Sequence, residues 1–326
     1  MITVKIHGGL GNQMFEYAFA RALSLKNHDS LRVDPSSLYD ITPREPDRYR
    51  KKYDKTWRKD VKYRSYGLAD VFAINPAFNW VARIESVVKI PYVATIVNKY
   101  YPRVFGKLGV WKYIKEKGMR FDPAYFNLKG NVYLEGYFRS EKYFKDYADT
   151  IRKDFTFRHP LEDDSARLGK EIAESNSVCL HVRRGDNVWN PASQKTHLVI
   201  PMSYYEKAVA IIKERAGKDI GIYVFSDDIE WCRTNMKFDA PLTFVGDEHK
   251  GIQDGGHLQL MSLCKHFIIP ESTFSWWAAW LAPSNLPRAE SRGVEGLGKI
   301  VIAPDEMFKD KTIETQDMIP EGWMRI

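Results

Sequence analysis

Short apolar runs alternate with longer amphipathic segments in the second half of the chain. Three short runs, each bounded by polar residues, predict buried strands at 177–180, 220–225 and 266–269. Apolar residues at three- and four-residue spacing predict helices over 204–215, 229–236, 258–264 and 274–281. Strands that alternate with helices predict a parallel sheet with crossover connections.

Polar residues follow each predicted strand at once. The first run leads into the hexapeptide HVRRGD at 181–186, the second into SDD at 226–228, and the third into a proline and then EST at 271–273. The carboxyl ends of parallel strands share one edge of the sheet, where open α/β sheets bind ligands. We therefore predict a Rossmann-like nucleotide-binding domain that begins near residue 165.

The amino-terminal half predicts a second unit of the same kind. A strand at 2–6 is followed by a glycine-rich turn at 7–13, a helix at 14–25 and a strand that ends at Asp34. This pattern is half of a dinucleotide fingerprint, but Met14 stands where the third glycine belongs, so a plain tight turn explains it equally well. The predicted fold class is α/β with two domains, 1–160 and 161–326, because proline and charge interrupt the pattern at 157–164.

The adjacent arginines Arg183 and Arg184 suit an anionic group such as a diphosphate. Each guanidinium can donate paired hydrogen bonds to oxygen anions, and Gly185 lets the backbone approach closely. Ser272 and Thr273 at a helix start would cap its amides and add donors for the same anion. The alternative is that both arginines are solvated charges paired with nearby carboxylates.

Several motifs in order along the chain resemble those of the bacterial α-1,2-fucosyltransferases, glycosyltransferase family eleven. They are GGLGNQMF at 8–15, EGYF at 135–138, SEKYF at 140–144, HVRRGD at 181–186, FSDD at 225–228, MSLCKH at 261–266 and STFSWW at 272–277. The resemblance implies a fold of the GT-B type, with two Rossmann-like domains facing a cleft. It also implies an inverting, metal-independent enzyme that moves L-fucose from GDP-β-L-fucose to the 2-hydroxyl of a galactoside-type acceptor.

No cofactor is expected, and the donor GDP-L-fucose is a substrate. The chain has no D-x-D sequence for a nucleotide-bound cation, and its eight histidines show no metal-ligand spacing. Arginine would then stabilise the charge that builds on the departing diphosphate, so Arg183 and Arg184 are predicted to act in catalysis as well as in binding.

The remaining candidate residues follow from the chemistry of the donor and from the resemblance. Asp227 or Asp228 suits the paired donors of guanine. The resemblance implies that His181 and Phe274 line the donor site and that Asn12 faces the donor sugar.

Asp186 is the leading candidate for the base that takes the proton of the acceptor hydroxyl. It could instead only orient Arg184, and His7, Glu16 and Glu271 stay open as alternatives. Glu16 and Glu271 stand where the family usually has glutamine and asparagine.

Charge is concentrated at 42–66, where ten Lys/Arg face four Asp/Glu, and the whole chain carries only +7. Most such runs are solvated insertions, but aromatic residues interleave with the bases here. An anionic membrane surface or a lipid-linked glycan acceptor would explain the run better than nucleic acid would, and no nucleic-acid partner is expected.

Three widely spaced cysteines, the absence of a leader-like amino terminus and the lack of an eighteen-residue apolar stretch predict a cytoplasmic protein. The basic run at 42–66 is compatible with a peripheral position at the inner membrane face. Three other functions stay open: transfer of another GDP-sugar, a dinucleotide-dependent oxidoreductase that uses Asp34, and a non-catalytic glycan-binding protein.

Overall fold

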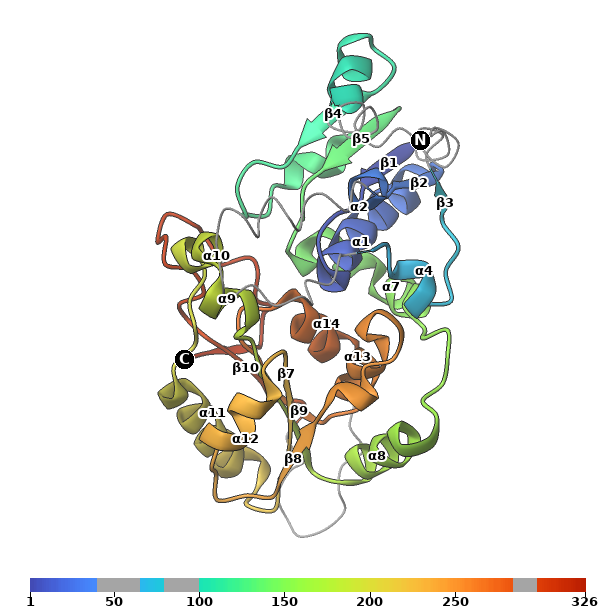
Figure 1. Ribbon diagram of the computed structural model, residues 1–326. Coiled ribbons are helices and arrows are strands. Elements are labelled where there is room, and N and C mark those ends of the chain that lie inside the picture. Colours follow the sequence, from blue (N-terminus) through green and yellow to red (C-terminus); the bar gives the residue numbers. More distant parts are fainter. Residues whose placement is uncertain (40–64, 79–99, 284–297) are drawn as a thin grey trace. The chain divides into compact units, whose positions relative to one another are not determined.

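The computed structural model describes residues 1–39, 65–78, 100–283 and 298–326. These residues form two compact units, Met1–Thr156 and Phe157–Ile326. Each unit contains a parallel β-sheet with helices packed against it (Figure 1). The predicted basic tract at 42–66 lies almost wholly outside the described residues.

The sheet of the first unit has five parallel strands in the order β3-β2-β1-β5-β4. Their bounds are β1 Ile2–Lys5, β2 Leu31–Asp34, β3 Ala77–Phe78, β4 Lys112–Lys115 and β5 Val132–Glu135. Helices of this unit are α1 Leu10–Asn27, α2 Ser36–Tyr39, α4 Leu68–Val71, residues 100–107 and α7 Ala148–Asp154. Three 3-10 turns cover Pro123–Asn127, Glu141–Tyr143 and Lys145–Tyr147.

Helix α1 begins four residues earlier than the sequence predicts. Gly8 has φ +75°, and Gly9 is extended before the first helical residue, Leu10. Every residue of 10–20 is buried, so the helix is fixed by packing on all sides rather than by one apolar stripe. As a consequence Asn12, predicted in a loop, lies in the first turn of α1.

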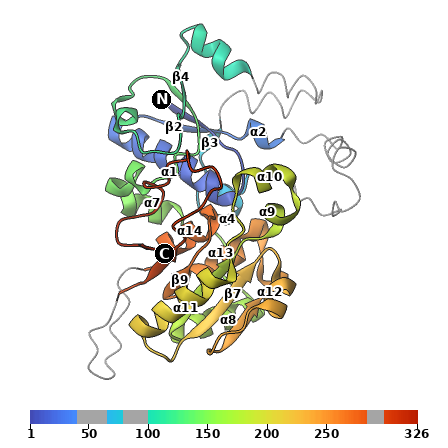
Figure 2. The ribbon, with the colours of Figure 1, turned by 90° about the vertical axis from the view of Figure 1, so that its left-hand side faces the viewer.

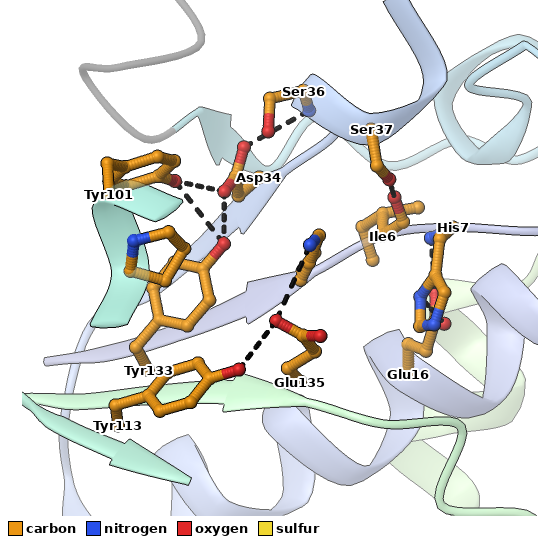
Figure 3. Close-up of polar contacts among 12 residues, drawn as sticks. Ile6, His7, Glu16, Asp34, Ser36, Ser37, Tyr101, Tyr113, Tyr133 and Glu135 are labelled. Atoms are coloured by element: carbon orange, nitrogen blue, oxygen red, sulfur yellow. Dashed lines mark hydrogen bonds and ion pairs between the residues drawn. The ribbon is translucent and has the colours of Figure 1, made fainter. Parts of the chain in front are cut away.

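A buried carboxylate ties distant parts of the first unit together (Figure 3). Asp34 at the end of β2 accepts hydrogen bonds from the hydroxyls of Tyr101 and Tyr133, and from the amide of Ser36 at 3.1 Å. Burial and the Asp34 carboxylate hold the pKa of Tyr133 well above its usual value, so this hydroxyl remains a donor. The Asp34 side chain is fully buried, and it is therefore not placed to accept a ribose hydroxyl as the oxidoreductase alternative required.

The sheet of the second unit has six parallel strands in the order β11-β10-β9-β6-β7-β8. Their bounds are β6 Ser177–Val182, β7 Gly221–Ser226, β8 Leu242–Val245, β9 His266–Ile268, β10 Val301–Ala303 and β11 Met324–Arg325. The helices are α8 Asp163–Glu174, α9 Gly185–Trp189, α10 Pro191–Thr196, α11 Met202–Ala216, α12 Ile229–Asn235, α13 Gly255–Ser262 and α14 Thr273–Leu281. Two 3-10 turns cover Asp247–His249 and Ile252–Asp254.

Helices cover both faces of this second sheet, which is why its central strands β6, β7 and β9 are buried and largely apolar. Val178, Leu180 and Val182 of β6 belong to a core shared with α11 and α12. Figure 1 shows α11 and α12 on one side of the sheet and α8 and α13 on the other, and Figure 2 looks onto the side that carries α11 and α12. The tryptophans of α14 are buried core residues, and the three cysteines are buried and free.

Candidate active site

The order in which the chain adds strands to the second sheet reverses at β6. The chain runs from β6 through β7 to β8 on one side, and then continues from β9 through β10 to β11 on the other side. Ligands of open α/β sheets bind at such a switch point, outside the carboxyl ends of the strands. The three predicted polar clusters follow β6, β7 and β9, which are adjacent strands, so the fold brings them to one edge of the sheet.

Arg183 is held between two carboxylates. Its Nη1 atom lies 2.5 Å from Oδ2 of Asp227, and its Nη2 atom donates to Oδ1 of Asp186. All three side chains remain about one-quarter to one-third exposed. Asp186, the candidate base, thus pairs with Arg183 and not with Arg184, in contrast to the orienting role that the sequence suggested.

Asp227 also shapes the turn that carries both arginines. Its Oδ1 atom accepts hydrogen bonds from the amides of Arg184 at 2.9 Å and Gly185 at 3.1 Å. A Cβ atom at position 185 would lie 2.3 Å from Oδ2 of Asp227, so only glycine fits there without a shift. Both oxygens of Asp227 are thereby engaged with the arginine turn, a use that the guanine prediction did not anticipate.

Arg184 lies flat on an aromatic ring. Its guanidinium carbon is 3.8 Å from the ring centroid of Trp231 in α12, and its Nε atom donates to Oδ2 of Asp228 at 3.2 Å. Stacking and one ion pair fix the plane of this guanidinium. Sequence reasoning missed Trp231, although its position four residues after Asp227 puts it in the first turn of the helix that follows β7.

His181 joins β6 to α14 across the switch point. Its Nδ1 atom lies 2.9 Å from Oγ of Ser275, and its ring lies 6.5 Å from that of Phe274. Burial, with Arg183 adding to it, lowers the pKa of His181 to about 3, so the ring is neutral. Ser272 occupies the N-cap position of α14, but its side chain makes no capping hydrogen bond, in contrast to the sequence prediction, and Thr273 is the first helical residue.

Glu271, another candidate base, also has a partner. Its Oε2 atom lies 2.9 Å from Nδ1 of His197, which follows α10. The His197 ring packs against Phe308 at 5.4 Å. The segment that includes α9 and α10 is therefore attached to the carboxyl end of β9.

In the first unit the corresponding edge of the sheet holds a buried acid and a histidine (Figure 3). Glu16 in α1 is fully buried; its Oε1 atom forms an ion pair with Nδ1 of His7, and its Oε2 atom accepts from the His7 amide at 2.9 Å. The His7 ring stacks on Tyr137 with centroids 4.5 Å apart. Beside them, Oδ1 of Asn12 accepts from Nη2 of Arg139 at 3.2 Å.

Burial controls the protonation of this pair. It raises the pKa of Glu16 to about 7, although His7 opposes the shift. Burial alone would lower the pKa of His7, but the carboxylate of Glu16 outweighs it and raises that pKa. The folded unit thus holds protons on this pair that the unfolded chain would release.

The sequence matches the family model described as glycosyl transferase family 11 over residues 1–286. The chain belongs to glycosyl transferase family 11. Among its relatives, an α-1,2-colitosyltransferase of Escherichia coli is 30% identical and covers 100% of this chain and 99% of its own length. The O-antigen biosynthesis glycosyltransferase WbnK of Escherichia coli is 32% identical over 93% of each chain. Galactoside 2-alpha-L-fucosyltransferase Sec1 of Mus musculus is 25% identical, over 86% of this chain and 64% of its own.

The family 11 membership confirms the predicted family and the prediction of a glycosyltransferase, and it excludes the oxidoreductase alternative. The predicted fold class, with two Rossmann-like α/β domains as in the GT-B type, is confirmed by the two parallel sheets. Within the described ranges, no three His, Cys, Asp or Glu side chains gather in a way that could hold a metal ion. No helix of the described residues is long and apolar enough to cross a membrane.

The His7–Glu16 pair predicts a pH-dependent stability. Both folded pKa values lie above the unfolded ones, so the stabilisation is complete below pH 4.5 for Glu16 and is lost as the pH rises through about 7. In Glu16→Gln this loss is absent. We expect the melting temperature of the parent, relative to that of Glu16→Gln, to fall by about 4 °C between pH 5 and pH 8, as roughly 1–2 kcal/mol would produce.

Thermal unfolding followed by circular dichroism at both pH values measures this difference. Glu174→Gln, which changes a largely exposed carboxylate in α8, is the matched control and should follow the parent at both pH values. A difference between parent and Glu16→Gln that is constant or grows with pH would contradict the assignment.

Proposed function

We propose that this family 11 enzyme transfers L-fucose from GDP-β-L-fucose to the 2-hydroxyl of a galactoside-type acceptor, with inversion at the anomeric carbon. The observation that carries the proposal is the pair Arg183 and Arg184 at the carboxyl end of β6, beside the start of α14. The printed names of two relatives, an α-1,2-colitosyltransferase and a galactoside 2-α-L-fucosyltransferase, support the linkage. The acceptor is an oligosaccharide or a lipid-linked glycan of the cytoplasm, and three free buried cysteines suit that reducing compartment.

The donor diphosphate would replace carboxylates as the partner of Arg183. Two adjacent guanidiniums that already bind Asp186, Asp227 and Asp228 form a site with strong affinity for oxygen anions. The amides at the start of α14, with Ser272 and Thr273, supply further donors. As the glycosidic bond breaks, these groups stabilise the growing negative charge without a metal ion.

Asp228 is the better placed carboxylate for guanine. It is 36% exposed, and its Oδ1 atom has no partner in the described part of the chain, whereas both oxygens of Asp227 bind the arginine turn. His181 and Phe274 lie at the same edge of the sheet, the first as a neutral ring. Asn12, fixed by Arg139 in the first unit, is the proposed contact to the donor sugar.

We propose Asp186 as the general base. In the structure its Oδ1 atom is engaged by Arg183. When phosphate oxygens take over that guanidinium, the carboxylate is released to accept the proton of the acceptor hydroxyl. Donor binding would in this way activate the base, so that the acceptor is deprotonated only beside a bound donor.

Transfer of colitose is the second candidate, because the relative that matches over the whole chain is named a colitosyltransferase. Colitose is fucose without the 3-hydroxyl. A site that hydrogen-bonds this hydroxyl rejects the deoxy sugar by about 10⁴-fold, whereas a site built for the deoxy sugar discriminates far less against an added hydroxyl. The ratio of kcat/KM for GDP-fucose to kcat/KM for GDP-colitose therefore distinguishes the candidates.

A donor panel tests the proposed function. The enzyme is given GDP-fucose, GDP-colitose or GDP-mannose with a β-galactoside in excess EDTA, and the product is examined by NMR. We expect an α-1,2-linked fucoside from the first donor and full activity in EDTA. Preference for GDP-colitose would select the second candidate, and GDP binding without transfer to any galactoside would favour a glycan-binding protein. Loss of activity on chelation, with recovery in Mg²⁺, would overturn the metal-independent mechanism.

Substitution of either arginine should suppress turnover. We expect Arg183→Ala or Arg184→Ala to lower kcat at least 100-fold, about 3 kcal/mol, because each removes a contact that strengthens as the leaving group gains charge. Lysine should restore little, since it cannot donate in a planar fork. Arg167→Ala in α8, where the side chain is 80% exposed, is the control and should leave kcat unchanged. Steady-state kinetics measures this effect. If an alanine variant at 183 or 184 kept a kcat within threefold of the parent's, that arginine would have no role in the mechanism.

The stack under Arg184 predicts a role for Trp231 in GDP affinity. Trp231→Leu should weaken GDP binding about tenfold because Arg184 loses its platform, and Trp231→Phe should weaken it less. A similar pair in the same unit, Arg233 on Phe244 at 5.2 Å, involves neither arginine of the turn, so Phe244→Leu is the control. Titration calorimetry with GDP measures each affinity. Equal losses for Trp231→Leu and Phe244→Leu would mean that the stack serves only stability.

A further inference from the structure

A basic hollow opens on the first unit beside its edge strand β4. It has a volume of about 800 Å³, and its charged lining consists of Arg103, Lys107, Lys112 and Lys129. No carboxylate lines it within the described residues. Over the whole stretch 100–131, seven Lys/Arg stand against two Asp/Glu. This surface therefore presents unbalanced positive charge to solvent.

Exposed apolar side chains surround the same cations. Of the nine large apolar side chains that are exposed in the described part of the chain, four lie within eleven residues: Tyr100, Val104, Leu108 and Val110. Leu108 is the most exposed of all nine, at 70%. We call these four residues and the four cations the β4 surface. Cations mixed with aliphatic side chains are typical of proteins that lie in the headgroup region of a bilayer.

A buried aromatic cluster supports the β4 surface. Tyr101 and Trp111 are buried with Tyr133 in one cluster, and Nε1 of Trp111 donates to the carbonyl of Pro102 at 2.9 Å. Tyr101 also reaches the buried carboxylate of Asp34 (Figure 3). The aliphatic side chains above this cluster are therefore exposed by a well-packed scaffold. Lysines on an edge strand also discourage strand pairing, but that role does not account for exposed Val104 and Leu108 on and after the helix at 100–107.

We propose that the β4 surface docks the enzyme on an anionic lipid bilayer. Lys107, Lys112 and Lys129 contact the headgroup phosphates, while Val104, Leu108 and Val110 enter the boundary between headgroups and acyl chains. A nucleic acid would match the charge but would leave these aliphatic side chains in water. The docking concerns residues apart from the arginine turn, and it does not depend on which sugar is transferred.

Sedimentation with vesicles tests the charges. The parent should bind phosphatidylglycerol vesicles and bind phosphatidylcholine vesicles far less. The triple variant Lys107→Gln, Lys112→Gln, Lys129→Gln should bind about 100-fold more weakly, since each cation near such a surface contributes about a fivefold factor. The matched control removes three exposed lysines of the second unit, Lys170→Gln, Lys218→Gln and Lys311→Gln, and leaves the same net charge. Equal weakening by both triples would overturn the proposal in favour of unspecific attraction.

A fluorescent probe tests the apolar contact. The three native cysteines are buried, so Leu108→Cys offers one accessible thiol for a polarity-sensitive dye. Its emission should shift to the blue on phosphatidylglycerol vesicles, and the shift should persist in high salt, whereas a dye on Lys170→Cys should not respond. No shift at position 108 on vesicles that bind the protein would overturn the proposed orientation. A shift without vesicles that grows with protein concentration would instead indicate self-association of the β4 surface.

Discussion

The carboxylate of Asp227 is the contact on which the candidate active site depends. Two adjacent arginines at the end of β6 repel each other, and a turn that carries them needs a counter-charge and a fixed backbone. Asp227 supplies both, because it binds the Arg183 guanidinium and accepts from two amides of the turn. With Asp186 and Asp228, it keeps the site neutralised before a donor arrives. Donor binding at the proposed site would therefore exchange one set of anions for another.

The two sheets use their switch points differently. In the second unit the edge carries two partly exposed arginines that are paired with carboxylates, and a neutral histidine. In the first unit the edge carries a fully buried glutamate and a partly exposed histidine that stacks on Tyr137. The same Rossmann-like topology thus carries arginines balanced by carboxylates in one unit and a proton-binding pair in the other. Electrostatics, rather than fold, separates the roles of the two units.

The sequence predicts β6, β7 and β9 of the second unit and their polar ends well, because buried parallel strands are short apolar runs and turn residues mark their ends. It predicts the start of α1 poorly, since residues 10–20 are all buried and the sequence there shows no apolar stripe beside a polar face. The contact of Trp231 with Arg184 depends on which strands are neighbours, and the double use of Asp227 depends on the register between β6 and β7. Neither can be obtained from spacing along one chain. The same limit applies to the hydroxyl of Ser272, which stands at an N-cap position but does not cap.

The buried Asp34 carboxylate has a consequence for the cooperativity of the first unit. It links the end of β2 to Tyr133 of β5 and to Tyr101, so the helix at 100–107 cannot detach without removing one of the three hydrogen bonds that this buried carboxylate accepts. Local opening of this helix is therefore coupled to loss of the central sheet, and the two should exchange amide protons as one unit. Anything that binds the outer side of the helix then stabilises the whole sheet by mass action. A molecule bound to the outer side of this helix would therefore slow unfolding at the centre of the unit.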